Sequence, residues 1–292
     1  MFIIADGGST KCDWAIVGDK LQIAETEGIN PYFCDSLQIE KILKKSLLPK
    51  IIGIKIDEVF FYGAGCRAEK CDVVKLALQA IFPYAKIEVE SDLLGAARAL
   101  FGKDSGIACI LGTGSNSCLY DGKEIKKNVP PLGFILGDEG SGAVLGRKFL
   151  SDLLKNQMTK KLKQKFFNKY KLTISEIIEK TYCQPLANRF LAQFMPFLST
   201  HICEPNIYNL VFDEFTEFIK KNIVQYAEYK EYKISFCGSV AYYFADVLKI
   251  AALEQNLNFG EIIQNPIEKL IEFHKNISKT ARTLPKPPSQ NR

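Results

Sequence analysis

The sequence has no long hydrophobic run and very few histidines. No apolar stretch approaches the roughly 18–20 residues that span a bilayer, and a strand-like segment begins at residue 2 without a basic leader. These features predict a cytoplasmic protein with no membrane partner. The two histidines, His201 and His274, are too few for a histidine metal cluster or a Ser–His–Asp triad, so we expect both to be ordinary helix residues.

Paired cysteine motifs are absent as well. The nine cysteines are scattered and odd in number, and no C-x-x-C pair occurs. In a chain of 292 residues this pattern indicates reduced, mostly buried thiols. It argues against a disulfide framework or a cysteine zinc site.

Acidic residues are missing from the end of the chain. The net charge is +5, but the last fifteen residues hold four basic residues and no acid, so the rest carries only +1. The basic character therefore predicts no nucleic-acid partner. Residues 277–292 are rich in proline and positive charge, and we expect a disordered tail there.

Strand and helix patterns alternate through the first half of the chain. Apolar runs at 57–62 and 86–90 are followed by helical periodicity at 68–82 and 93–101, which predicts an α/β layer structure. From 142 to about 229 the pattern is almost wholly helical. A strand at 233–236 and a last helix at 266–275 complete the prediction.

Residues 2–17 consist of two apolar runs around a glycine turn, which predicts a β-hairpin. The turn reads GGSTK, and Asp6 stands at its entrance. Glycines let a backbone approach a ligand, and consecutive N–H groups in such a turn bind anions. An acid beside an anion needs a cation between them, so Asp6 indicates Mg²⁺ held with phosphate. Taken alone, the stretch fits an ordinary hairpin turn slightly better.

Four other segments change that balance. LGTGSNS at 111–117 forms a second glycine hairpin, GDEGSG occupies 137–142, GSV occupies 238–240, and Asp92 stands where a strand meets a helix. Each alone fits a plain turn or a helix cap. Together, two hairpin loops, one in each half of the chain, would grip the phosphates of one nucleotide from both sides.

In this order and spacing, the segments resemble the superfamily of actin, heat-shock chaperones and sugar kinases. Within it, the chain is most similar to the N-acetylglucosamine kinase branch, also called the BadF/BadG-type ATPase family. The resemblance covers about residues 2–275, and GTGSN followed by GDEGS is its most specific part. It implies an α/β fold with two RNase H-like (actin-like ATPase) domains, a nucleotide cleft between them and a helical insertion in the second.

We place the first domain at residues 1–105 and the second at 106–276, with the last helix returning to pack on the first domain. The resemblance implies an ATP-dependent kinase that uses Mg²⁺ and transfers the γ-phosphate to the 6-hydroxyl of an amino sugar. It also implies a homodimer, since kinases of this branch often form dimers.

The resemblance assigns roles to individual residues. Asp92 matches the catalytic base; with an ordinary pKa near 4 it would mainly orient the sugar hydroxyl and take its proton late. Asp6 matches the acid that holds Mg²⁺ through water. Asp138 matches a sugar-binding acid, and a carboxylate can accept hydrogen bonds from two neighbouring hydroxyls. The residues implied for ATP are Asp6, Gly7, Gly8, Ser9, Thr10, Lys11, Gly112, Thr113, Gly114, Gly238 and Ser239, and those implied for the sugar are Asn30, Asp92, Ser115, Asn116, Asp138 and Glu139.

Several of these roles stay open. The direction of Lys11 is not predicted, and a solvated lysine fits nearly as well. Ser115 and Asn116 would meet either an N-acetyl group or phosphate, and Glu139 would serve the sugar or the helix N-terminus. Many family members carry Gly-Trp-Gly before the sugar loop, whereas this chain has Leu132 at the tryptophan position. The sugar is therefore N-acetylglucosamine by resemblance, with N-acetylmuramic acid and glucosamine as alternatives.

Two other functions are compatible with parts of this pattern. An ATPase activator of a dehydratase or reductase would hold an iron–sulfur cluster on paired cysteines, but the family's GGQD motif is missing and only Cys66 and Cys71 lie near each other. A sugar-responsive repressor would need a DNA-binding module before the first strand.

Overall fold

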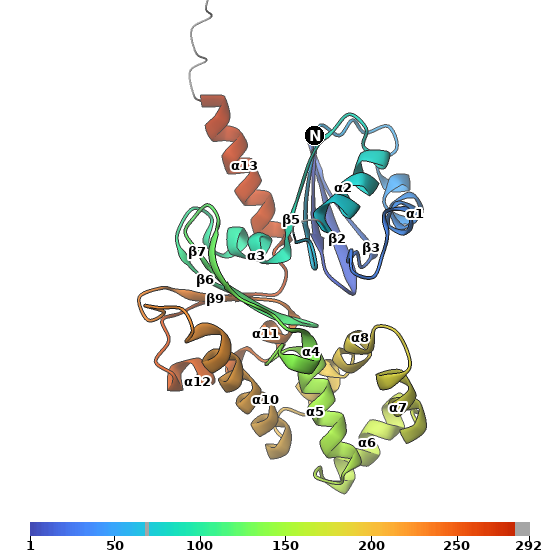
Figure 1. Cartoon of the computed structure of the whole chain (residues 1–292), viewed down its shortest axis with the longest axis vertical. Coiled ribbons are helices and arrows are strands. Elements are labelled where there is room, and N and C mark those ends of the chain that lie inside the picture. Colours follow the sequence, from blue (N-terminus) through green and yellow to red (C-terminus); the bar gives the residue numbers. More distant parts are fainter. Residues whose placement is uncertain (68–69, 284–292) are drawn as a thin grey trace, which may run out of the picture. The chain divides into compact units, whose positions relative to one another are not determined.

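The computed structural model describes residues 1–67 and 70–283 (Figure 1). In the last helix, side chains are described as far as Ile277. Its contacts divide the chain into two units. One contains Met1–Gly102 and the segment that begins at Pro266, and the other contains Lys103–Asn265. Each unit is described by itself.

The first unit is built on a five-stranded sheet in the order β3-β2-β1-β4-β5. β1 (Phe2–Gly7), β2 (Lys11–Val17) and β3 (Leu21–Glu27) form an antiparallel meander. β4 (Glu58–Gly63) and β5 (Lys86–Ser91) run parallel to β1. The hairpin expected at 2–17 is thus confirmed.

Helices cover both faces of this sheet. α1 (Ser36–Ser46) and α2 (Lys70–Ile81) lie on one side, and α3 (Asp92–Phe101) and α13 (Ile267–Thr283) on the other (Figure 1). A short 3₁₀ turn, η1 (Leu48–Lys50), follows α1. Asp35 caps α1 in a capping box with Gln38.

The side chain of Trp14 lies in the core of this unit, fully buried beside Phe61. Its indole N–H donates a 3.0 Å hydrogen bond to Thr26, which satisfies its polar atom. The only tryptophan of the chain therefore stabilises the fold.

The second unit has the same strand order when its sheet is followed from the opposite edge, β10-β9-β6-β7-β8. β6 (Gly106–Leu111), β7 (Ser115–Tyr120) and β8 (Ile125–Val129) form the meander, and β9 (Ile234–Cys237) and β10 (Phe259–Ile263) are the parallel strands. Each unit therefore has a glycine loop between its first two strands, as the repeated strand–turn–strand pattern predicts.

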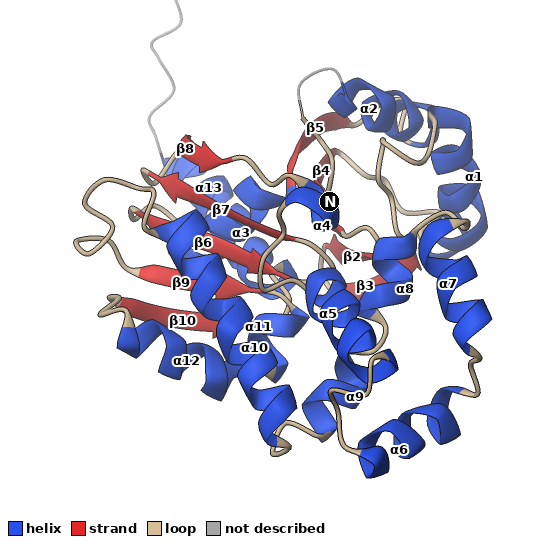
Figure 2. Ribbon diagram, turned by 60° about the horizontal axis from the view of Figure 1, so that its bottom comes forward, coloured by secondary structure: helices blue, strands red, loops and turns tan. Residues whose placement is uncertain are grey.

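A helical segment separates β8 from β9, which confirms the helical prediction for 142 to about 229 (Figure 2). Its helices are α4 (Gly133–Leu136), α5 (Gly142–Leu154), α6 (Lys160–Tyr170), α7 (Ile174–Tyr182), α8 (Ala187–Ala192), α9 (Met195–Thr200), α10 (Pro205–Phe218) and the π-helical turn η2 (Ile219–Ile223). α11 (Ser239–Tyr243) and α12 (Ala245–Glu254) follow β9, and α10 packs beside α12. Phe149, Phe166 and Phe197 pack together inside the insertion.

The last helix is longer than its sequence pattern predicts. α13 continues to Thr283, so 277–283, which we expected in the tail, are helical. The first helix breaker after Asn276 is Pro285, and nothing before it stops the helix. The remaining tail residues, 284–292, lie outside the described residues.

Three further features bear on the sequence predictions. All nine cysteines are free thiols and five are buried, which confirms that the chain has no disulfide framework. Within the described ranges, no helix is both long and apolar enough to cross a membrane. His274 is buried against Phe60 and bonded to the Tyr62 hydroxyl, so it is part of the core of the first unit.

Candidate active site

The carboxyl ends of three parallel strands carry two acidic groups of the first unit, Asp6 and Asp92. Asp6 lies near the end of β1, and Asp92 immediately follows β5, with β4 between them. In open α/β sheets, ligands bind at this edge. The two acids that the sequence separates by more than eighty residues therefore face one site.

Asp6 lies in an unfavourable position for a negative charge. Burial, together with the negative charges of Asp92 and Asp13, raises its pKa to about 7, and Lys11 opposes this only in part. An additional cation would relieve the repulsion. These oxygen donors fit the hard ligands that Mg²⁺ prefers.

Asp92 occupies the first position of α3, and Ser91 caps the helix through the Leu94 N–H. One carboxylate oxygen of Asp92 accepts a 2.8 Å hydrogen bond from Leu93 N–H. Burial raises the pKa of Asp92, while the Leu93 N–H and the charge of Arg67 lower it. Our expectation of an ordinary pKa was therefore wrong, because the sequence does not reveal how far a helix N-terminus is buried.

The first glycine loop packs against the loop that follows β3. The Asn30 amide donates a 3.1 Å hydrogen bond to the Ser9 hydroxyl, and Gly28 N–H donates to the Thr10 carbonyl at 3.0 Å. Asn30 also accepts a hydrogen bond from Tyr32 N–H. Gly65, with φ of 78°, leaves room for it, since a Cβ there would lie 2.5 Å from the Asn30 oxygen.

The sequence leaves the direction of the Lys11 side chain open. In the structure this side chain points towards acidic residues of β2 and β3. Its ammonium group pairs with Asp13 at 3.0 Å and with Glu25 at 3.3 Å. Two carboxylates therefore already balance its charge, and an ATP contact by Lys11 remains a prediction.

The second glycine loop, Gly112 to Gly114, is bonded to the start of α5. Gly142 N–H and Ala143 N–H donate to the carbonyls of Gly112 and Thr113. Ser141 caps the next amide, that of Val144. Because these helical N–H groups already have acceptors, this helix end holds the loop and offers them to no anion.

Asp138 is held directly against the second loop. Its carboxylate accepts hydrogen bonds from the N–H groups of Ser115 and Gly133. Burial and the nearby Glu139 charge nevertheless raise its pKa to about 6. The two motifs that are most specific in the sequence, GTGSN and GDEGS, are thus joined in one structure.

Asn116 and Glu139 have partners within the second unit. The Asn116 oxygen accepts from Ser117 N–H and from the Asn128 amide on β8. Glu139 pairs with Lys221 at 3.3 Å and accepts a 3.4 Å hydrogen bond from Asn222. Contacts of Asn116, Ser115 or Glu139 with a sugar remain predictions.

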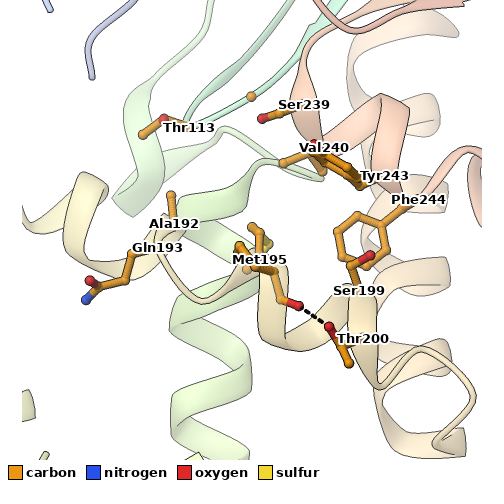
Figure 3. Close-up of a pocket in the computed structure, with 12 residues that line it drawn as sticks. Thr113, Ala192, Gln193, Met195, Ser199, Thr200, Ser239, Val240, Tyr243 and Phe244 are labelled. Atoms are coloured by element: carbon orange, nitrogen blue, oxygen red, sulfur yellow. Dashed lines mark hydrogen bonds between the residues drawn. The ribbon is translucent and has the colours of Figure 1, made fainter. Parts of the chain in front are cut away.

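A pocket of about 500 Å³ opens beside the second loop (Figure 3). Gly112 and Thr113 line one end, and Ser239 and Val240 lie across from the α9 residues Met195 and Ser199. Gly238, with φ of 122°, permits this arrangement, because a Cβ there would collide with the Leu111 carbonyl. Apolar walls with a few hydroxyls and this volume suit a nucleoside.

Sequence reasoning identified only part of this pocket. The motifs indicated Gly112, Thr113, Ser239 and Val240, but they gave no sign of the other lining residues, which come from α8, α9 and α11 or directly follow them: Ala192, Gln193, Met195, Pro196, Ser199, Thr200, Tyr243 and Phe244. These residues belong to an ordinary amphipathic pattern, and no local signal marks them.

One solved structure is similar over nearly the whole chain. It is a candidate N-acetylglucosamine kinase from Porphyromonas gingivalis, 48% identical, with a TM-score of 0.91, covering 94% of this chain and 99% of that one. The chain belongs to the N-acetylglucosamine kinase family. It is therefore an ATP-dependent phosphotransferase, as the resemblance implied.

More distant structures share the fold alone. A candidate N-acetylglucosamine kinase from Chromobacterium violaceum is 15% identical with a TM-score of 0.72, covering 93% of this chain and 98% of that one. A ROK family glucokinase from Streptomyces griseus, in complex with glucose and AMPPNP, is 11% identical with a TM-score of 0.59, covering 94% and 98%. These matches confirm the actin-like α/β fold. No family model and no curated sequence matches the chain.

Proposed function

We propose that this kinase phosphorylates the 6-hydroxyl of an amino sugar, N-acetylglucosamine before N-acetylmuramic acid or glucosamine. The observation that carries the proposal is the direct bonding of Asp138 to the GTGSN loop. In this proposal the Asp138 carboxylate accepts the sugar hydroxyls beside a loop of the type that binds phosphate. The Porphyromonas protein described above is a candidate kinase for the same sugar.

Asp92 is the base in this proposal. It orients the sugar hydroxyl and accepts its proton as the hydroxyl oxygen bonds to the γ-phosphorus and the bond to the β-phosphate oxygen breaks, releasing ADP. Its raised pKa makes it a better proton acceptor than an exposed aspartate. Leu93 N–H holds one carboxylate oxygen and so fixes the direction of the group.

Asn30 and Asp138 bind the sugar in this proposal. Asn30 has one amide hydrogen beyond the one given to Ser9, so it can donate to a sugar hydroxyl. Asp138, in the second unit, accepts from two hydroxyls. Leu132, which is exposed, stands where an aromatic wall would contact the ring.

ATP would place its base in the pocket between α9 and α11, with its phosphates at the two glycine loops. Asp6 would hold Mg²⁺, which supplies charge neutralisation to the phosphates when bound. The first loop contributes the backbone N–H groups of Gly8 to Thr10 and the Ser9 hydroxyl. We further expect the chain to act in the cytoplasm as a homodimer.

The decisive experiment measures ADP release with a panel of amino sugars, for the wild type and for Asp92→Asn. We expect turnover that requires a sugar and falls by about 10²–10⁴-fold in Asp92→Asn. Sugar-independent turnover, with iron in the purified protein, would instead support the ATPase-activator function. Equal activity of the two proteins would exclude Asp92 as the base.

A further inference from the structure

The loop at 137–141, called the sugar loop below, has a backbone that needs support. Asp138 has φ of 55° and Gly140 has φ of 70°. A left-handed backbone is unfavourable for a residue with a side chain, so contacts around Asp138 must maintain it. Ser115 N–H, at the start of β7 directly after the second glycine loop, holds one side of the sugar loop.

Glu214 of α10 holds the other side. Its side chain is buried, with 1% of the residue exposed. One carboxylate oxygen accepts a 3.3 Å hydrogen bond from Gly140 N–H, and the other pairs with Lys148 of α5. Burying a carboxylate is costly unless it is paired. Both partners given to this carboxylate belong to the sugar loop or to the helix that the loop begins.

The turn η2, which continues α10, contacts the sugar loop at a second residue, Glu139. Asn222 and Lys221 contact Glu139 from η2. Asn222 is eight residues after Glu214, and in an undisturbed α-helix its side chain would lie about 80° further round. The π turn takes more residues per turn and reduces that angle. It therefore brings Asn222 towards the face that carries Glu214.

The segment also contacts the strand that leaves the second glycine loop. The Ser117 hydroxyl on β7 donates to the Asn222 carbonyl at 3.4 Å and bonds to the Tyr226 hydroxyl at 2.7 Å. Among the described residues of the second unit, the buried polar side chains are Ser115, Ser117, Ser141, Glu214, Asn222 and Ser235. All except Ser235 belong to the two loops or to the elements that hold them.

We propose that Glu214 is a positioning residue that, together with Asn222, fixes the sugar loop and the direction of the Asp138 carboxylate. This inference rests on the proposed function, in which Asp138 binds sugar hydroxyls. Glu214 itself touches no substrate. Its loss should weaken sugar binding and leave nucleotide binding nearly unchanged.

The test compares Glu214→Gln and Glu214→Leu with the wild type, and Asp213→Asn is the matched control. Asp213 is the adjacent acid of α10 and is exposed. Leucine removes the acceptor for Gly140 N–H, whereas glutamine keeps an acceptor and loses only the charge. We expect the KM for sugar to rise about 30-fold in Glu214→Leu and less in Glu214→Gln, with the KM for ATP within about twofold. Asp213→Asn should match the wild type.

An unchanged KM for sugar in both Glu214 variants would overturn the inference, as would equal increases for sugar and ATP. If Glu214→Leu does not fold, Glu214→Gln and Lys148→Met carry the test. Hydrogen exchange across 137–143 gives a readout that needs no sugar. Faster exchange there, with β6 unchanged, supports the inference even if the wild type uses no sugar; unchanged exchange overturns it.

Discussion

The Asn30 amide donates a 3.1 Å hydrogen bond to the Ser9 hydroxyl. Asn30 is the proposed sugar-binding residue of the first unit, and Ser9 belongs to its proposed phosphate loop. One hydrogen bond thus connects the two proposed subsites within one unit, and Tyr32 N–H fixes the amide from the other side.

We predict that Asn30→Ala raises the KM for sugar at least about tenfold. It should also lower the free energy of unfolding by about 1–2 kcal/mol, because Tyr32 N–H loses its acceptor. Asn30→Asp keeps an acceptor for Tyr32 and removes the amide donor, so it should be more stable than Asn30→Ala while still binding sugar weakly. Chemical denaturation and steady-state kinetics measure the two effects. Equal sugar binding by wild type and Asn30→Asp would contradict the role of the amide.

The raised pKa of Asp138 predicts a pH dependence of sugar binding. Its pKa in the folded protein is about 6, so below that pH the carboxylate gains a proton and loses acceptor capacity. The KM for sugar should increase as pH falls below about 6, following one proton. In Asp138→Asn the KM should be high and independent of pH. The range from about pH 5 to 8 extends about one to two units to either side of the Asp138 pKa. A wild-type KM for sugar that stays constant over this range would contradict the role of Asp138.

The same raised pKa also predicts that the Asp138 carboxylate lowers the stability of the fold at neutral pH. An acid whose folded-state pKa is raised destabilises the fold: the penalty grows as pH rises from the ordinary value of 3.8 to about 6, and it is fully present above that pH. Asp138→Asn should therefore be more stable than the wild type at pH 7.5, by about 1 kcal/mol after allowance for solvent. The difference should vanish near pH 4. Denaturation of both proteins at the two pH values measures it.

The pocket between α9 and α11 provides a test that is specific for ATP. Ser199 lines it and is partly exposed, so Ser199→Phe should fill the space without disturbing the core. We expect the KM for ATP to rise at least about tenfold while the KM for sugar stays within about twofold. Ser151→Phe, at an exposed position on α5, is the control. Unchanged ATP binding in Ser199→Phe would show that the adenine base of ATP binds outside this pocket.

His274 gives the first unit a separate sensitivity to acid. Burial and the charge of Arg98 lower its pKa to about 4, so the folded state keeps it neutral while the unfolded chain takes up a proton near 6.5. Stability should therefore fall between about pH 6.5 and 4, by about 2–3 kcal/mol in total from this residue. His274→Gln should lose this component. A difference in the free energy of unfolding between the two proteins that is the same at every pH would refute this role of His274.

Local patterns made the two sheets and their loops predictable. A glycine turn between two apolar runs specifies a hairpin from a few neighbouring residues, and the parallel order of β1, β4 and β5 then brings Asp6 and Asp92 to one edge. The α8 and α9 residues that line the pocket were not predictable, because long-range packing of ordinary apolar helices brings them there. Glu214 was equally invisible, since only the fold shows that this acid of α10 is buried behind Gly140. The pKa of Asp92 depends on burial for the same reason.

The path of the chain through its two units has a consequence for synthesis. The second unit is one continuous segment, Lys103–Asn265, whereas the first is completed only by α13, which packs on α3, β1 and β2. A ribosome thus makes all of the second unit before the helix that covers the sheet carrying Asp6 and Asp92. Until His274 emerges and bonds to Tyr62, the face of that sheet bearing Phe60 has no α13 to cover it. The unit that begins first is therefore the last to have all of its chain.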